Sequence, residues 1–505
     1  MITNSYELYG QFVLRGEGER VPAGWETRSL GGWIVAAHSL LPLTQIHDTN
    51  NELIGWLIGH ALIEGSIVRD VWRLPIRIAS EKDARVFEEA LYRFGGRWAC
   101  VLIAPNVQRV YLDPSGSLAT VYRQDQKIIA STPTLAHLDS IDAYRAKKST
   151  ETPLPANHFW PAGLTGDEDT RRIIPNHYLD LSTWKTIRHW PLAPIQRVPE
   201  AFAAEKAKLI VGRLRCNIKA ISSGYSVYMG LSAGRDSRMI MGAAKSLIDN
   251  FTFVTFNYKD PAKFADLHIA TKLAKKFGLK HESLDLLDPP REQKLEYLYR
   301  VGYCNNAGKA CDFYDACGRL LDMKRAWLTG YGGEVGRAFY WKPDDAGKKL
   351  LADDLLARMH LNLDERNLFA MKQWLGEMPD HLDAHAILDL MYIELRLGCW
   401  ASPQQYGTAP FAAILTPFTH RLTYQSMLEL PLAYRARQGM TDDVLKQTWP
   451  ETLALPFQQY SGMLGFAGRL REGYKKLKRK VRSRLGLLKQ PVVVPTISRS
   501  TETGS

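Results

Sequence analysis

Two short stretches of the sequence place an acid among small residues where a buried strand is expected to end. The first, residues 226–238, reads SVYMGLSAGRDSR, an apolar strand followed by a tight turn and the start of a helix. Small residues let backbone N–H groups approach phosphate oxygens, and a helix N-terminus adds partial positive charge. Because Asp236 would repel a phosphate unless a divalent cation separated them, the stretch predicts a phosphate loop that works with Mg²⁺. The alternative is a plain strand-to-helix turn in which Asp236 only caps the helix.

The second stretch, residues 326–340, reads AWLTGYGGEVGRAFY, a strand end followed by glycines and Glu334. Strand ends on one edge of a parallel sheet share a crevice. We therefore expect both turns to face one nucleotide, with Asp236 and Glu334 holding the same Mg²⁺ while pyrophosphate leaves.

The elements expected around these turns change character along the chain. Up to about residue 190, short β-type runs dominate, interrupted by helical stretches around 52–62 and 84–94. From about residue 199, helices alternate with strands as in a parallel sheet, and the chain beyond 346 is mostly helical. We predict an α/β fold with a layered domain over 1–195, a parallel-sheet domain over 196–465 and a tail over 466–505. The expected elements of the alternating part are helices 201–222, 236–247 and 263–277 and strands 226–231, 251–256, 281–285 and 326–330.

The composition is that of an ordinary soluble globular protein. Hydrophobic residues make up 45% of the 505 residues and charged residues 23%, which excludes wholesale disorder and fibrous repeats. The six cysteines form no CxxC pair, no signal peptide and no membrane span are evident, and a cytoplasmic location is expected. Much of the net charge of +12 lies in residues 466–489, where ten Lys/Arg face one acid. That segment predicts a basic helix that is either solvated or docks onto a protein or peptide partner; nucleic acid is a less favoured partner.

Residues 232–238 resemble the SGGxDS loop of ATP pyrophosphatases, with Ala233 in place of the first glycine. The second turn resembles the SGEGSDE motif of asparagine synthetase-like ATP-dependent ligases, with Glu334 on its second magnesium-binding acid. This resemblance implies ATP and Mg²⁺ as cofactors and Asp236 and Glu334 as metal ligands. The ATP-binding residues it implies are Leu231, Ser232, Gly234, Arg235, Asp236, Ser237, Thr255, Phe256, Thr329 and Gly330.

At Tyr331 the sequence differs from the SGEGSDE motif, and this difference makes the turn more similar to those of particular members of the family. The β-lactam synthetases have GYG here, where the tyrosine acts as a base, and lasso-peptide cyclases have GHGGD. The resemblance implies Tyr331 as the base toward an amine, or else as a wall of the pocket, because a tyrosine with a pKa near 10 needs help to act as a base. Asp389 and Glu394 are candidates to orient it, on sequence position alone, and the predicted catalytic residues are Tyr331, Glu394 and Lys446.

Further downstream, residues 396–400 (RLGCW) are similar to the family's RxxxW, and residues 439–446 (GMTDDVLK) match its GxxKxxLR poorly. Asp442 stands where the family has a lysine that steadies the acyl-adenylate, and Lys446 stands at the arginine. Either another cation (Lys446, Arg437 or Arg337) meets the charge that develops on the transferring oxygen, or the chemistry is slow or altered. Asp266 is expected either to cap its helix or to serve the nucleotide.

The first half resembles the glutaminase half of asparagine synthetases, in ALYRFGGRWACVLI (90–103) and YLDPSGSLATVY (111–122). That half works through an N-terminal cysteine, whereas this sequence starts Met1-Ile2-Thr3 and its first cysteine, Cys100, falls inside a predicted strand. We therefore expect no glutamine hydrolysis and a structural or substrate-docking role for this domain.

Together these features predict an ATP-dependent ligase that adenylates a carboxylate and joins it to an amine. The amine is expected within the same substrate, as in peptide macrolactam cyclases, or on a second substrate, as in specialised-metabolite amide synthetases. Three alternatives stay open: an asparagine synthase-type enzyme using free ammonia, a tRNA-modifying ATP pyrophosphatase, and a degenerate nucleotide-binding scaffold.

Overall fold

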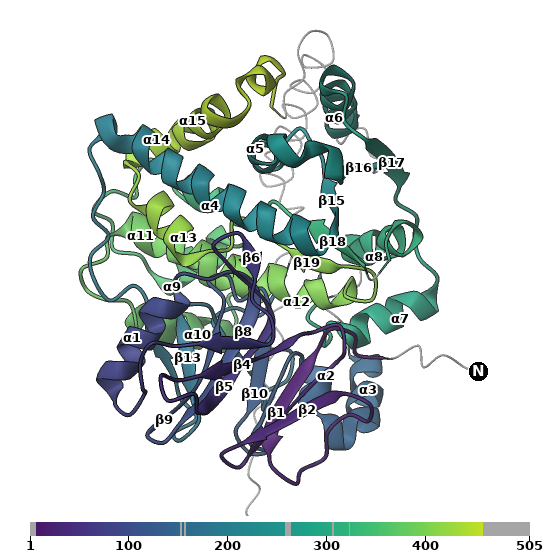
Figure 1. The fold of residues 1–505 in the computed structure, drawn as a ribbon, viewed down its shortest axis with the longest axis vertical. Coiled ribbons are helices and arrows are strands. Elements are labelled where there is room, and N and C mark those ends of the chain that lie inside the picture. The colour runs from purple at the N-terminus through teal and green to yellow at the C-terminus, as the bar shows by residue number, and fades with distance from the viewer. Residues whose placement is uncertain are drawn as a thin grey trace, which may run out of the picture.

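A computed structural model describes residues 7–457 of the chain, except for 152–153, 156–157, 258–263, 306–307 and 323. The basic segment 466–489 and the predicted tail 466–505 lie outside the described residues. The described chain forms two antiparallel sheets in its first half and one parallel sheet in its second half, as the α/β prediction requires (Figure 1). The boundaries at 195 and 465 stay a prediction.

The first half is built in four layers. A six-stranded and an eight-stranded sheet face each other across one apolar core, helix α1 covers the outer face of the larger sheet, and α2 covers that of the smaller sheet. All pairings are antiparallel except that of β4 with β7. The six-stranded sheet has the order β12-β10-β11-β1-β3-β2, with strands β1 Phe12–Gly16, β2 Glu26–Leu30, β3 Trp33–Ala37, β10 Thr120–Arg123, β11 Ile128–Ala130 and β12 Arg171–Ile173. The eight-stranded sheet has the order β14-β13-β9-β8-β5-β4-β7, with β6 paired to β5, and strands β4 Leu43–His47, β5 Leu53–Ile63, β6 Ser66–Ile67, β7 Val71–Arg73, β8 Gly95–Ala104, β9 Val107–Leu112, β13 His177–Asp180 and β14 Thr186–Arg188.

The prediction of a helix around residues 52–62 is wrong, because this stretch is strand β5. Its apolar run LIGWLIGHALI lacks the alternation of a half-exposed strand, since both of its faces are covered. Trp56 and Ile58 point into the core between the sheets, while Leu57 and Ala61 pack in the core beneath α1. A strand buried on both sides cannot be distinguished by its sequence pattern from a buried helix.

The second half contains a parallel five-stranded sheet with apolar clusters on both faces. Its strands are β15 Ser226–Gly230, β16 Phe251–Asn257, β17 His281–Asp285, β18 Arg325–Leu328 and β19 Ala413–Leu415. They lie in the order β17-β16-β15-β18-β19, and every neighbouring pair is parallel. Four of the five match predicted strands; the three-residue β19 is too short for its sequence to indicate.

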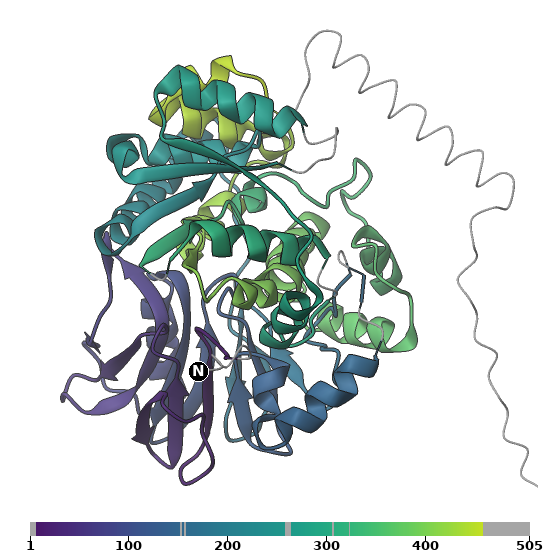
Figure 2. The same cartoon turned by 90° about the vertical axis from the view of Figure 1, so that its right-hand side faces the viewer.

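Helices cover this sheet, and some of them reach the first half of the chain (Figure 2). Helix α4 buries Ala207, Ile210, Val211, Leu214 and Ile218, at the three- and four-residue spacing of one helix face. The helices are α1 Glu81–Leu91, α2 Pro133–Ala136, α3 Ile141–Thr150, α4 Ala203–Gly224, α5 Arg235–Ala243, α6 Phe264–Phe277, α7 Arg291–Arg300, α8 Gly308–Leu320, α9 Ala352–Arg358, α10 Glu365–Gly376, α11 Ala384–Leu390, α12 Ser402–Gln404, α13 Arg421–Leu428, α14 Leu432–Ala436 and α15 Gly439–Thr448, with a π-helix over Met391–Ala401.

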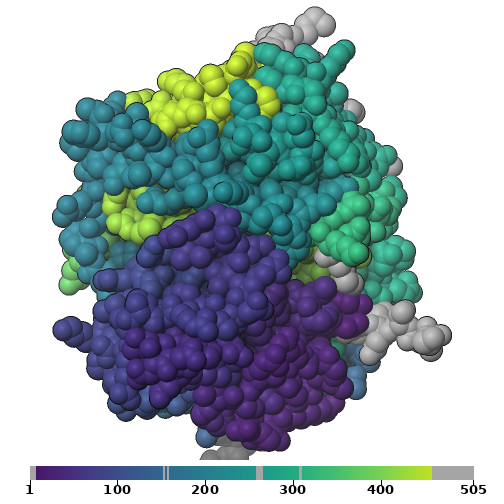
Figure 3. Space-filling model, in the orientation of Figure 1, coloured from purple at the N-terminus to yellow at the C-terminus, as the bar shows by residue number. Residues whose placement is uncertain are grey.

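The two halves lie directly against each other (Figure 3). They share one apolar cluster. Leu62, Ile174 and Trp190 from the first half join the core that surrounds α4 and the parallel sheet. Among the described helices, none has the length and apolar character that a bilayer crossing needs.

Candidate active site

The order of the parallel strands determines where a ligand can bind. Along the chain the sheet is built outward from β15, first through β16 and β17 on one side and then through β18 and β19 on the other. The strand order therefore reverses between β15 and β18, and the connections leaving their carboxyl ends diverge there. In open α/β sheets this crevice is where ligands bind. The loop with Asp236 follows β15, and the turn with Glu334 follows β18.

The loop after β15 has the geometry of an anion cradle. Gly234, in an extended conformation, precedes α5, whose N-terminus receives no side-chain cap. The Ser232 hydroxyl accepts a hydrogen bond from Gly234 N (3.1 Å) and lies 3.0 Å from the Ser237 hydroxyl. These contacts hold the loop in shape and leave the first N–H groups of α5 directed at the crevice.

Ala233 fits this loop without strain, because its backbone is not in the left-handed region. Its N–H donates to Asp266 Oδ1 at 3.2 Å, so Asp266 at the start of α6 supports the loop from behind. Of the two roles considered for Asp266, this contact favours the one on the nucleotide side.

Asp236 and Glu334 meet in the structure although they are 98 positions apart. Arg337 donates a hydrogen bond to Asp236 Oδ2, and the same guanidinium nitrogen lies 3.7 Å from Glu334 Oε1. The turn approaches Asp236 so closely that only glycine fits: a Cβ on Gly333 would lie 2.1 Å from Asp236 Oδ1, and one on Gly330 would lie 2.9 Å from Asp236 Cβ. These contacts explain Gly330 and Gly333 of the second turn.

The electrostatics of this pair favour a cation. Burial raises the pKa of Asp236 well above its ordinary value, and the charge of Glu334 raises it further, whereas Arg337 opposes the rise. Burial also raises the pKa of Tyr392, with Glu334 as the next cause. Asp236 Oδ1 and Glu334 Oε2 are buried without a hydrogen-bond partner. Two carboxylates with unpaired buried oxygens fit the needs of Mg²⁺, which is commonly held by one or two carboxylates together with substrate phosphates. The described residues contain no group of three acids, histidines or cysteines that could hold a metal without a ligand's help.

Of the three cations considered to replace the missing lysine, one lies beside the two acids. Lys446 is 62% exposed and pairs with Asp443, and Arg437 is 53% exposed and pairs with Glu200. Arg337 is 18% exposed and bridges the two carboxylates. The geometry therefore favours Arg337 over Lys446.

The two loop arginines have different environments. Arg238 is buried and donates to the carbonyl oxygens of Thr452, Leu455 and Pro456, so it anchors the chain after α15. Arg235 stacks on Phe457 at 4.3 Å. Burial lowers the pKa of Arg235 and the charge of Asp442 raises it, so Asp442 faces the loop at the place where a lysine was expected.

The remaining predicted nucleotide residues line the same strand ends. Leu231 N donates to Val254 O, and the Thr255 hydroxyl donates to Leu231 O at 2.8 Å, which ties β15 to β16. Phe256 packs against Trp327, and the Thr329 hydroxyl lies 2.5 Å from that of Thr416.

Tyr331 lies beside Trp400, with ring centroids 6.5 Å apart in an edge-to-face arrangement. Its two expected orienting acids are engaged with other partners. Glu394 is fully buried and accepts hydrogen bonds from Asn176, Trp374 and both terminal nitrogens of Arg188. These contacts favour a structural role for Glu394, in joining the two halves.

Asp389 is engaged in a similar way. It forms a two-pronged ion pair with Arg435 and accepts a hydrogen bond from Trp341.

Nothing in the sequence indicated that Tyr392 lies next to Glu334 or that it belongs to a π-helix. The stretch MYIELRLGCWA reads as an ordinary apolar helix, and nothing in it signals the wider turn. Cys100 lies buried in β8, where burial raises the pKa of its thiol. Residues 1–6 are outside the described chain, so the absence of glutaminase chemistry stays a prediction.

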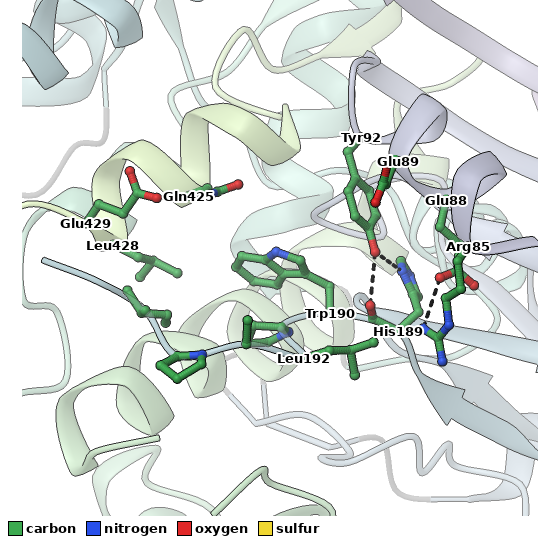
Figure 4. Close-up of a pocket in the computed structure, with 14 residues that line it drawn as sticks. Arg85, Glu88, Glu89, Tyr92, His189, Trp190, Leu192, Gln425, Leu428 and Glu429 are labelled. Atoms are coloured by element: carbon green, nitrogen blue, oxygen red, sulfur yellow. Dashed lines mark hydrogen bonds and ion pairs between the residues drawn. The ribbon is translucent and has the colours of Figure 1, made fainter. Parts of the chain in front are cut away.

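A cavity of about 430 Å³ lies apart from these residues, between α1, the segment 189–195 and α13 (Figure 4). Trp190 forms its wall, and the Tyr92 hydroxyl lies 2.9 Å from both Nδ1 and the carbonyl oxygen of His189. None of the residues predicted to bind ATP lines it.

Known proteins resemble this chain only weakly. No protein-family model and no curated protein matches the sequence. Three solved structures that align with the chain are NMN synthetase from Francisella tularensis (TM-score 0.19, 13% identity, 38% of this chain and 92% of that one), NH3-dependent NAD synthetase from Campylobacter jejuni in complex with the nitrate ion (0.19, 13%, 36% and 99%) and glutamine phosphoribosylpyrophosphate amidotransferase from B. subtilis complexed with ADP and GMP (0.19, 11%, 75% and 90%).

Proposed function

We propose that the chain is an ATP-dependent amide-forming ligase. It adenylates a substrate carboxylate with release of pyrophosphate, and an amine then displaces AMP. The observation that carries the proposal is the meeting of Asp236 and Glu334 beside the phosphate loop, at the reversal of the strand order. These two acids would hold Mg²⁺, whose contribution is to offset the charge of the leaving pyrophosphate.

The protein's own groups then have separate tasks. The uncapped N-terminus of α5 binds phosphate oxygens through its N–H groups. Arg235 and Arg337 supply positive charge near the α-phosphate, in place of the lysine that Asp442 replaces. Arg337 is the better placed of the two, because it already lies against both acids. Positive charge on a fixed side chain stabilises the negative charge that develops during transfer of the adenylyl group.

Tyr331 is the proposed base toward the amine, since it lies in the turn that carries Glu334. The similarity of TGYGGE to the turns of β-lactam synthetases and lasso-peptide cyclases favours an amine within the substrate, or on a second substrate, over free ammonia. The first half, 1–195, is then a docking or structural domain without glutaminase chemistry.

A second candidate is a nucleotide-binding scaffold without catalysis. Asp442, which brings a negative charge to the phosphate loop, favours it. The two proposals differ in turnover: both predict Mg²⁺-dependent ATP binding, and only the ligase releases pyrophosphate.

The test combines binding and turnover. Calorimetric titration with ATP in Mg²⁺ and in EDTA measures the metal-dependent affinity, and pyrophosphate release is followed with panels of carboxylates and amines. Asp236→Asn should abolish the effect of Mg²⁺ on ATP binding. The matched control Asp125→Asn, an exposed acid in the first half, should leave it unchanged. Equal Mg²⁺-dependent binding by wild type and Asp236→Asn would refute the metal assignment.

A further inference from the structure

The π-helix Met391–Ala401 lies between α11 and α12 and presents two different faces. Its wide turn is visible in side-chain contacts that span five residues: Cys399 Sγ lies 3.6 Å from Glu394 O, and the Ser402 hydroxyl donates to Leu397 O at 2.8 Å. Such turns are rare and occur often at functional sites. Glu394, on one face, contacts the first half of the chain.

The opposite face, which carries Tyr392, Arg396 and Trp400 four residues apart, lies along the second turn. Tyr392 is buried next to Glu334, and its ring centroid is 4.8 Å from that of Phe339. Trp400 meets Tyr331, at the other end of the face.

The Arg396 guanidinium lies over the Trp400 ring, with its carbon atom 3.5 Å from the ring centre. A guanidinium stacked on an indole is held in one orientation. Arg396 forms no ion pair with any acid of the described chain. No acid of the described chain therefore pairs with its charge, which acts on a neighbouring phenol. The pKa of Tyr340 is raised to about 12, because burial raises it more than the charge of Arg396 lowers it.

We propose that Arg396, fixed on Trp400, stabilises the phenolate of Tyr331 and so makes Tyr331 an effective base. This inference rests on the proposed function, in which Tyr331 accepts the proton of the amine. Arg396 is a positioning residue, since it acts on the substrate through Tyr331. A carboxylate such as Glu394 would have the opposite effect, because a negative charge favours the protonated phenol.

The amine nitrogen attacks the carbonyl carbon of the acyl-adenylate, and its proton passes to the Tyr331 phenolate. The new C–N bond forms as the C–O bond to AMP breaks, and AMP leaves with the bonding electron pair. The phenol then returns its proton to solvent.

The size of the effect follows from distance. Arg396 and Tyr331 both contact Trp400, at 3.5 and 6.5 Å. The guanidinium is therefore within about 10 Å of the Tyr331 ring, where one charge at an effective dielectric constant near 20 shifts a titration by about one pH unit. Among the residues that the structure describes, the titratable or charged groups near Tyr331 include Tyr297 on α7, and Asp236, Glu334 and Arg337 beside its own turn.

The test measures the phenol directly and needs no substrate. Difluorotyrosine is placed at position 331 of the full chain and titrated by ¹⁹F NMR. Arg396→Gln should raise the apparent pKa of the label by about one pH unit, and Arg396→Lys, which keeps the charge, should restore most of the shift. The control Arg366→Gln, which removes another arginine stacked on a tryptophan (Trp160, 4.8 Å), should leave the titration unchanged.

An unchanged or lowered pKa in Arg396→Gln would overturn the inference, and so would failure of Arg396→Lys to restore the shift. If Arg396→Gln does not fold, Arg396→Met and Arg396→Lys give the same comparison. Failure of the proposed function shows differently, as absent pyrophosphate release in the wild type while the titration shift persists. In an active enzyme, Arg396→Gln should move the basic pH profile of amide formation and leave ATP–pyrophosphate exchange unchanged.

Discussion

Removal of Arg337 offers a direct test of whether Asp236 and Glu334 form a cation site. The guanidinium contacts one carboxylate and lies 3.7 Å from the other. At ~4 Å and an effective dielectric constant of ~20, each such pair is attracted by about 4 kcal/mol, and solvent screening reduces the net value greatly. The three side chains are 16–22% exposed. We therefore expect Arg337→Gln to lower the free energy of unfolding by about 1–2 kcal/mol in EDTA.

Magnesium should reverse that loss. In the variant, Mg²⁺ binds the two acids without competition from a guanidinium, and at 100 times its Kd it stabilises the folded chain by about 2.7 kcal/mol. In the wild type the gain should be smaller, because Arg337 already offsets part of the charge of the two acids. Urea unfolding and thermal melts, each with EDTA and with a Mg²⁺ series, measure the difference.

A matched arginine serves as the control. Arg197 is 21% exposed and pairs with Asp383, away from the second turn. Arg197→Gln should cost similar stability in EDTA and show no added response to Mg²⁺. The reasoning is refuted if Arg337→Gln and Arg197→Gln respond alike to Mg²⁺.

Three further outcomes are expected. Asp236→Asn should raise the melting temperature in EDTA at neutral pH. Burial raises the folded-state pKa of Asp236, so ionisation of this side chain above its unfolded-state pKa costs stability, and the amide removes that cost; a lower melting temperature contradicts this. Glu394→Gln should cost about 3–5 kcal/mol in urea unfolding, since it leaves Arg188 buried without its partner. Because the pKa of Glu394 is lowered from 4.5, the wild type should lose this contribution as the pH falls below that value, and the variant should not. Ala233→Gly should restore the glycine of the resembled loop yet lose about 0.4–1 kcal/mol without a gain in ATP affinity, because Ala233 needs no left-handed backbone.

Local patterns in the sequence were sufficient to predict the alternating part of the fold. Apolar runs, small residues and helix signals correctly predicted strand β15, helix α5 and strand β16. They could do so because these signals act over only a few residues. The same signals failed at β5, where both faces are covered, and at β19, which has only three residues. Burial on both faces is a property of the assembled layers, and it removes the alternation on which the prediction depends.

The sequence by itself determined which residue types could serve a nucleotide: the loop at 231–238 and the acid in the glycine-rich turn. Only the tertiary structure decided how they combine. It brought Asp236 and Glu334 to the same crevice and placed Arg337 between them, while Lys446 pairs with a neighbour at the surface. It also engaged Glu394 with Arg188, and it placed Arg396 and Tyr331 against the same indole, that of Trp400. The physical reason is that charge acts through space, so the environment of each group depends on chain segments that the local sequence does not contain.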